Sequence, residues 1–308
     1  MKWIWTLLIF LWGCYNDTGA DGEVAGRVTF LDVGQGLAVL LEQEGRFAMY
    51  DLGPDSAGVW DSLRARGVDT LEWAVLSHNH RDHGGSVFEM NLGDGSAGGE
   101  GASPFIRRLY VGPDTSGGFV RDSILRVAFR LKIPVDTLYR GDELSLGTMT
   151  LKVLWPATFT KVGDNGASLV LQGRSAGGYD GSVLGRSNSA GSDNPDVSFL
   201  LTGDLDSAGE RRLMELSPDL TSGLLQVGHH GSAGSSTLRF LSRVAPRQAV
   251  ISVGAHNGYG HPTENVLRKL QYVIGVPVDS SRSELISRTD LEGSVSYQVI
   301  PGVGILKD

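Results

Sequence analysis

From residue 27 onward, short apolar runs bounded by glycine-rich turns alternate with stretches that repeat apolar residues at helical spacing. The first pattern is typical of buried strands and the second of helices that pack on a core. Strands are predicted at 28–31, 37–41, 46–50, 73–77, 149–155, 168–172, 197–202, 223–228 and 248–253 and within 284–300. Helices are predicted at 56–66, 119–131, 207–216, 236–243 and 263–272. Because no linker divides this mixture, we expect one α/β domain over residues 27–308.

Two polar segments interrupt the pattern. Residues 91–104 and 173–196 are rich in glycine, serine, aspartate and asparagine. Such segments bury little apolar surface, so we expect them to be surface insertions.

The N-terminus differs from the rest of the chain. One lysine precedes an apolar run, in which Thr6 is the only polar residue, and Gly13-Cys14 follows. This is typical of a secretory signal over 1–13 and is too short to span a bilayer. Cys14 lies where a bacterial lipobox places its lipidated cysteine, so we expect a membrane-anchored lipoprotein with a tether over 14–26. The alternatives are secretion after signal cleavage, or a buried apolar helix with an incidental cysteine.

Composition narrows the chemistry. The 308 residues include 35 acidic and 27 basic side chains, for a net charge of -8. That charge excludes a protein that coats nucleic acid non-specifically. The single cysteine excludes an intramolecular disulfide and a cysteine-rich zinc site.

The densest chemical signal is Ser-His-Asn-His-Arg-Asp-His over residues 77–83, directly after a predicted strand. In extended chain, residues two apart point to the same side, so His78 and His80 can hold one metal ion. The turn can then bring Asp82 and His83 to a second ion. Imidazole and carboxylate suit zinc, iron or manganese. The alternative is a polar loop that happens to contain histidines.

Further acids and histidines end predicted strands, namely Asp51, Asp204 and the pair His229–His230. A lone aspartate there is more often a turn former or helix cap. Together with the first cluster, however, they form a set for two metals, in which Asp204 can give one oxygen to each ion. Two ions about 3.5–4 Å apart can hold a hydroxide and clamp a phosphodiester.

These residues resemble the metallo-β-lactamase superfamily. His78, His80, Asp82 and His83 match its H-x-H-x-D-H signature, and Asp204 and His229 match its bridging acid and later histidine. Asp51 matches an acid that hydrogen-bonds a ligand histidine. The chain is most similar to the C-terminal domain of the competence protein ComEC, through residues 30–36, 76–85, 200–205, 227–232, 251–254, 257–262, 289–290 and 293.

The resemblance covers about residues 27–300. It implies a four-layer αβ/βα sandwich and a hydrolase with two divalent ions, zinc or manganese. The family's membrane channel region has no counterpart in the sequence, which favours a stand-alone secreted relative over a protein of DNA uptake.

The sequence departs from the family pattern at one metal ligand. No histidine lies between His83 and His229, and Asn165 stands where the family has a third histidine. An amide oxygen is a weaker ligand than imidazole. We therefore expect a tighter ion bound by Asp82, His83, Asp204 and His229. The looser ion is expected to have the ligands His78, His80 and Asp204.

Other candidates lie around this set. His230 could orient His229 or donate a proton to the leaving group, and His261 could act as a general acid or bind phosphate. Ser232 could bind phosphate at a helix start or simply cap the helix. We expect Asp82, His230 and His261 to be the catalytic residues.

The leading hypothesis is a metal-dependent phosphodiesterase or nuclease outside the cytoplasm, which uses a hydroxide held by two ions. A local excess of basic residues over 101–140 makes single-stranded DNA a candidate partner, although a solvated basic face is the simpler interpretation. The alternatives are hydrolysis of an amide or ester, as in β-lactamases and lactonases, and a non-catalytic metal-binding module.

Overall fold

The computed structural model describes residues 26–90, 103–113, 118–157, 165–175, 197–276, 282–301 and 303–308. The predicted signal, Cys14 and nearly all of the tether and of the two predicted insertions lie outside these ranges. No helix in the described ranges combines the length and apolarity needed to cross a membrane.

Two large sheets stack face to face. The first sheet contains both parallel and antiparallel strand pairs. Its strand order is β17 (Gly304–Lys307), β16 (Val295–Ile300), β1 (Gly26–Phe30), β2 (Ala38–Gln43), β3 (Arg46–Leu52), β5 (Trp73–Val75), β7 (Leu109–Val111) and β8 (Val135–Thr137). The order of the second is β15 (Ile286–Arg288), β14 (Gln248–Ile251), β13 (Leu224–Gln226), β12 (Ser198–Leu201), β11 (Val170–Ser175), β10 (Met149–Trp155) and β9 (Glu143–Leu146). A small pair joins β4 (Thr70–Leu71) to β6 (Phe105–Ile106).

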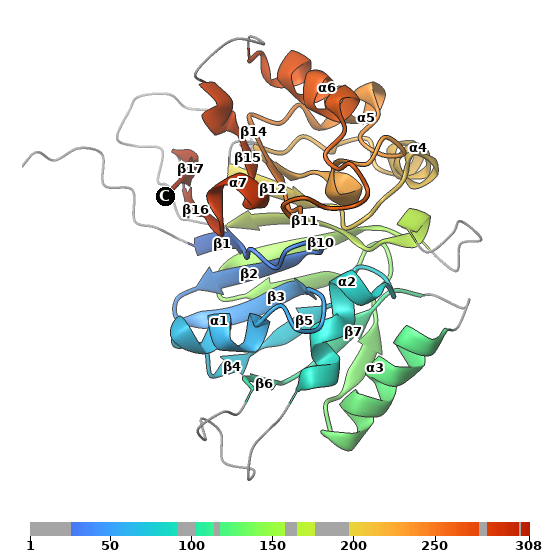
Figure 1. Cartoon of the computed structure of the whole chain (residues 1–308), viewed down its shortest axis with the longest axis vertical. Coiled ribbons are helices and arrows are strands. Elements are labelled where there is room, and N and C mark those ends of the chain that lie inside the picture. The colour runs from blue at the N-terminus through green and yellow to red at the C-terminus, as the bar shows by residue number, and fades with distance from the viewer. Residues whose placement is uncertain are drawn as a thin grey trace, which may run out of the picture.

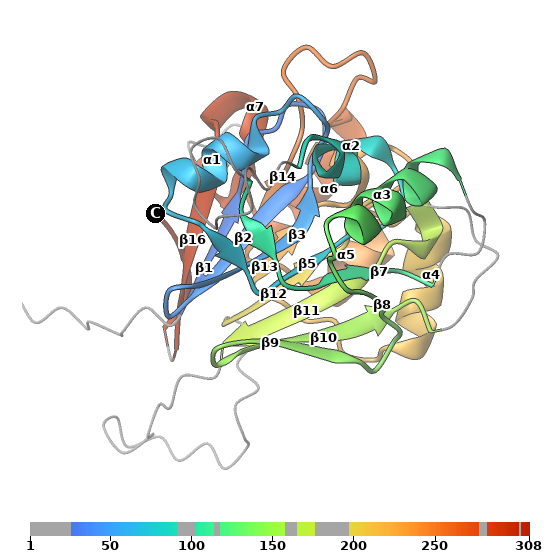
Figure 2. The same cartoon turned by 90° about the horizontal axis from the view of Figure 1, so that it is seen from below.

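Helices cover the outer faces of both sheets (Figure 1). On the first sheet these are α1 (Val59–Ala65), α2 (Arg81–Gly84) and α3 (Phe119–Arg130). Figure 2, seen from below, shows α1 and α3 in front of its strands. The second sheet carries α4 (Ser207–Leu216), α5 (Leu238–Val244) and α6 (Glu264–Ile274), and the short α7 (Thr289–Glu292) follows β15.

The buried apolar side chains form three clusters that match the three interfaces of four layers. Phe30, Tyr50 and Phe199 belong to the cluster between the two sheets. A second cluster joins the first sheet to α1 and α3, and a third joins the second sheet to α4, α5 and α6. Successive strand residues such as Met49 and Tyr50 fall in different clusters because strand side chains alternate between faces. The predicted αβ/βα sandwich is confirmed.

Several predicted boundaries are wrong. Helix α1 begins at Val59, not at 56, because Gly58 before it adopts a left-handed conformation (φ 66°). Strand β11 extends to Ser175, so 173–175 belong to the sheet and not to an insertion. The closing segment contains α7 between two strands, where only strands were predicted.

Candidate metal centre

The predicted ligands meet where strands from both sheets end. Strand β3 leads to Asp51, β5 to the 77–83 segment, β12 to Asp204 and β13 to the histidine pair. Within each sheet these strands run parallel to a neighbour, as β3 does to β5 and β12 to β13. Parallel strands present their carboxyl ends at one edge, which is where ligand sites of such sheets form.

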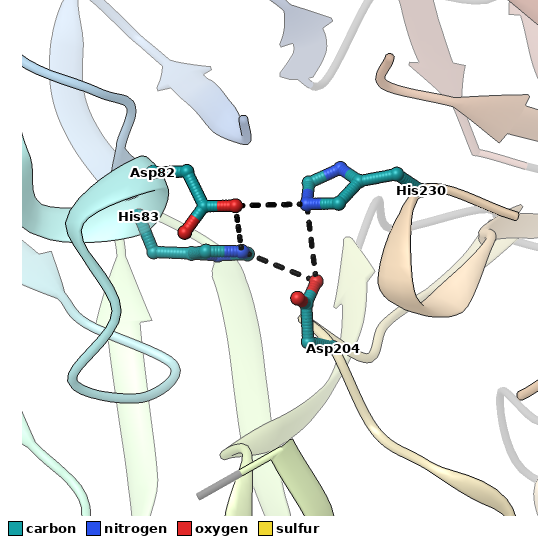
Figure 3. Close-up of side chains that lie close together, drawn as sticks. All are labelled: Asp82, His83, Asp204 and His230. Atoms are coloured by element: carbon teal, nitrogen blue, oxygen red, sulfur yellow. Dashed lines mark ion pairs between the residues drawn. The ribbon is translucent and has the colours of Figure 1, made fainter. Parts of the chain in front are cut away.

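Two groups of side chains have ligand atoms within 4.8 Å of one another. The first contains His78, His80 and Asp204. The second contains Asp82, His83, Asp204 and His230, whose side chains converge in Figure 3. His80 is extended (φ -86°, ψ 152°) and α2 begins directly after it, so the segment passes from strand-like to helical between the two groups.

Asp204 belongs to both groups, and its two oxygens face different imidazoles. Its Oδ1 lies 3.1 Å from His83 Nε2 and 3.4 Å from His230 Nε2. Its Oδ2 lies 3.9 Å from His78 Nε2 and 3.6 Å from His229 Nε2. This is the arrangement that a carboxylate shared between two ions requires.

The donor atoms fit a divalent metal. His78 Nε2, His83 Nε2, His230 Nε2 and Asp204 Oδ1 are buried and have no hydrogen-bond partner among the described residues. Buried polar atoms in folded proteins nearly always have a partner. Imidazole nitrogens and carboxylate oxygens that converge in this way match the ligand preference of zinc, iron and manganese.

Asp51 holds two histidines of the centre in position. Its carboxylate accepts hydrogen bonds from Ser77 N at 2.6 Å and Ser77 Oγ at 2.7 Å, and lies 2.7 Å from His83 Nδ1. Ser77 Oγ also lies 3.0 Å from His78 Nδ1. One buried carboxylate therefore orients a histidine of each group, directly for His83 and through Ser77 for His78, and leaves both Nε2 atoms for metal.

His230 is oriented by a backbone contact. Its Nδ1 donates to the carbonyl of Ser252 at 2.8 Å, just after β14. That bond uses Nδ1, so Nε2 is the ring nitrogen that faces Asp82 and Asp204, 3.4 Å from each carboxylate.

Without metal, the surrounding charges and burial favour a neutral His78 but protonated His83 and His230, because the pKa of the first is lowered and those of the other two are raised. Burial, together with the neighbouring His83, lowers the pKa of His78 well below its usual value and keeps it neutral. Burial alone would lower the pKa of His83, but the carboxylates of Asp204 and Asp51 outweigh burial and raise it. Metal binding by His83 is therefore coupled to loss of a proton.

The histidine pair differs from the prediction. The structure places His230, not His229, with Asp82 and His83, so His230 lies in a ligand position. His229 lies on the Oδ2 side of Asp204 with a partly exposed side chain. Both residues are left-handed (φ 52° and 53°), and such a turn breaks the strand alternation that would have told the two apart.

Asn165 lies beside His229, with its Nδ2 3.4 Å from each ring nitrogen. Its Oδ1 is buried without a hydrogen-bond partner among the described residues. The amide thus contacts His229, and the expectation that it replaces a third histidine ligand stays a prediction.

Ser232 is not in the centre. Its Oγ accepts a 3.3 Å hydrogen bond from Gly234 N, and it is not among the residues that line the adjoining cavity. Helix α5 begins later, at Leu238, with Thr237 as its capping residue. Ser232 instead stabilises the turn, because its hydroxyl and its backbone form hydrogen bonds within the loop.

A cavity of about 490 Å³ opens over the centre. Its lining residues come from both halves of the chain, and they are Gln35, Pro54, Asp55, His80, Arg81, Asp82, Asp204, His229, His230, Tyr259 and His261. His261 lies beside His229, with ring centroids 5.8 Å apart. The sequence predicts His261 here but not Tyr259, although an aromatic residue in a glycine-rich loop beside a candidate histidine is a usable signal.

The relatives of this chain include two proteins that match nearly all of it. The chain is 28% identical to ComE operon protein 3 of Bacillus subtilis and 29% identical to competence protein ComA of Neisseria gonorrhoeae. The matches cover 96% and 95% of this chain and 35% of each relative. This chain is a ComEC-like protein. It spans about a third of the length of these relatives, and no protein-family model matches it.

Among solved structures, the ComEC-like chain is similar to CmlA, a diiron β-hydroxylase from Streptomyces venezuelae. That similarity has a TM-score of 0.51 at 11% identity and covers 89% of this chain and 54% of the other. The metallo-β-lactamase fold protein YhfI from Bacillus subtilis gives a TM-score of 0.49 at 12% identity, with 85% and 95% covered. The similarity to CmlA concerns the fold alone.

Proposed function

We propose that this ComEC-like chain is a metal-dependent phosphodiesterase or nuclease that binds two divalent ions, zinc or manganese. The observation that carries the proposal is Asp204, whose two oxygens face two separate groups of ligands at the floor of an open cavity. Two-ion centres suit phosphodiesters because the substrate's oxygens can bridge both charges.

When bound, the ions would activate water and stabilise negative charge on the phosphate. His78, His80 and Asp204 would hold one ion, and Asp82, His83, His230 and Asp204 would hold the other. The second group has one more protein ligand, so the expectation of unequal affinities remains, with His230 in place of His229.

His261 and His229 supply the polar groups beside the ions. Burial and the neighbouring His229 lower the pKa of His261, so its imidazole is neutral near pH 7. A neutral imidazole still has one N–H to donate. We therefore assign His261 to hydrogen bonding of a phosphate or leaving-group oxygen, in place of a positively charged acid.

A substrate panel tests this function. The purified protein, supplied with manganese or zinc, is offered bis-p-nitrophenyl phosphate, linear single-stranded DNA and nitrocefin. We expect cleavage of the two phosphodiesters that is lost in Asp82→Ala. Cleavage of nitrocefin alone would instead identify an amide hydrolase. No cleavage of any substrate with either metal would contradict the proposal that the protein is an enzyme.

We further propose that α3 contacts single-stranded DNA. Phe119 and Phe129 are 82% and 87% exposed, and Arg126 is exposed on the same helical face. Arg126, Arg130 and Lys132 have no ion pair within the described ranges, whereas Arg107 pairs with Glu72 at 3.4 Å and Arg108 with Asp136. Unpaired cations beside exposed aromatic rings match a surface for phosphates and stacked bases.

Charge reversal on α3 gives a measurable prediction. In the double variant Arg126→Glu/Arg130→Glu, the slope of log K against log salt for single-stranded DNA should fall by about 1.4, because each lost phosphate contact removes about 0.7. Binding is measured by fluorescence anisotropy with metal-free protein, so that cleavage does not interfere. The control is Arg211→Glu/Arg212→Glu on α4, which makes the same charge change on the other outer layer. Equal slopes for both variants would exclude α3 as the contact.

We also propose that the chain is exported and anchored through Cys14, which lies outside the described residues. The sole cysteine follows a short apolar segment with an N-terminal lysine. Cells expressing the chain should incorporate labelled palmitate into it, and Cys14→Ala should abolish that label. A labelled Cys14→Ala chain would rule out this anchor.

A further inference from the structure

Tyr259 is an aromatic side chain that the metal chemistry does not use. It is 72% exposed, yet it lines the cavity over the metal centre together with His261. Leaving a large aromatic ring in water forgoes the burial that usually stabilises it. An exposed ring at the mouth of a site is therefore a candidate contact for a ligand.

Hydrogen bonds fix the backbone of the loop that carries this ring. Asn257 uses its whole side chain within the loop: its Nδ2 donates to Gly254 O at 3.0 Å and His261 O at 2.7 Å, and its Oδ1 accepts from Tyr259 N at 3.2 Å and His261 N at 3.0 Å. Gly254 N in turn donates to Gln35 Oε1 at 3.1 Å. Tyr259 is thus presented by a bonded turn, and less entropy is lost when a ligand binds it.

The ring is also set for stacking. Tyr259 and His261 lie with their ring planes 25° apart and their centroids at 5.8 Å. His261 Nδ1 is buried without a hydrogen-bond partner in the described ranges. A flat ligand on the other face of Tyr259 would extend this aromatic column, in which His261 lies between Tyr259 and His229.

The same cavity is lined by an arginine that has an acidic partner. Arg81 precedes Asp82 on α2, its side chain is mostly exposed, and it pairs with Asp55. A cavity with an aromatic platform, an arginine and a metal centre matches a chain that alternates flat rings with phosphates.

We infer that Tyr259 forms a nucleobase subsite, which stacks a base next to the phosphate held over the metal centre. This inference rests on the proposed phosphodiesterase function and narrows its substrate class to nucleic-acid strands with unpaired bases. Tyr259 is a binding residue here, and it takes no part in proton transfer.

The test compares a short single-stranded oligodeoxynucleotide with an abasic strand of the same sugar–phosphate length. Tyr259→Ala should lower kcat/KM for the base-containing strand about tenfold, equivalent to roughly 1.4 kcal/mol, as expected for one stacked base. It should leave the abasic strand nearly unchanged. Tyr259→Phe should restore the wild-type value because the ring is what stacks, and Tyr259→Leu should not.

The matched control is Tyr272→Ala on α6, a tyrosine that is 76% exposed and does not line the cavity. It should behave as wild type. Equal loss on base-containing and abasic strands, or no loss on either, would overturn the subsite.

A second readout separates this inference from the proposed function. Affinity for both strands is measured by fluorescence anisotropy with metal-free protein, where no cleavage occurs. If wild type cleaves neither strand with any metal but Tyr259→Ala still weakens binding of the base-containing strand, the function fails and the subsite stands. If wild type cleaves both strands and Tyr259→Ala binds and cleaves them equally well, the subsite fails and the function stands.

Discussion

Asp204→Asn should remove at least one bound ion and reduce phosphodiester hydrolysis by about 10³-fold, since the two-ion centre contributes several kcal/mol to charge stabilisation. The substitution keeps the shape of the side chain but removes its charge and one of its two acceptor oxygens. Both oxygens are in use, because Oδ1 faces His83 and His230 while Oδ2 faces His78 and His229. Metal content after dialysis and kcat/KM for bis-p-nitrophenyl phosphate measure the two effects.

Asp206→Asn is the matched control for that experiment. Asp206 lies two residues further along and caps α4 by accepting from Ala208 N and Gly209 N. Asparagine serves equally well at this position, so stability, metal content and activity should stay at wild-type levels. An Asp204→Asn protein that retains two ions and hydrolyses the substrate at the wild-type rate would exclude the bridging role.

Asp51→Asn should weaken metal binding by about 10- to 100-fold although Asp51 touches no metal, which is the usual effect of losing a group that orients a ligand. The carboxylate accepts from both donors of Ser77 and contacts His83 Nδ1. An amide has one acceptor oxygen, so at least one of these contacts is lost, and the imidazoles of His83 and His78 lose their fixed orientation. Isothermal titration of the metal-free protein measures the affinity.

Two further measurements sharpen the Asp51 experiment. Asp32→Asn, in an exposed turn where Asp32 accepts from Gly34 N at 3.2 Å, should bind metal as wild type does. Circular dichroism of Asp51→Asn should show a folded protein, since the substitution conserves volume at a buried site. A folded variant with unchanged affinity would show that Asp51 does not support the centre.

The sequence was most informative where local geometry determines the outcome. Residues 78–83 hold four potential ligands within reach of one turn, and the structure has the expected change from extended chain at His80 to helix at Arg81. The strands with continuous apolar runs were also found, because burial on both faces leaves a strong signal. Strands β7 and β8 were missed, since each has only three residues and carries half-exposed positions.

The histidine pair shows why the rest could not be predicted. Choosing between His229 and His230 requires the backbone angles of the turn after β13, and both residues adopt left-handed angles that non-glycine residues rarely use. The partner that orients His230 is the carbonyl of Ser252, a contact between strand ends that no spacing in the sequence encodes. The hydrogen bond between Ser77 and His78 could not be predicted for a similar reason, because a serine at a strand end more often has only a structural role.

The central claim is that this fold holds two ions that together hydrolyse a phosphodiester. Titrating metal-depleted protein with manganese or zinc while following hydrolysis of bis-p-nitrophenyl phosphate tests it most directly. We predict no hydrolysis without metal, and a rate that reaches its maximum only when two equivalents are bound. Hydrolysis that is independent of metal, that saturates at one equivalent, or that never appears would contradict the claim.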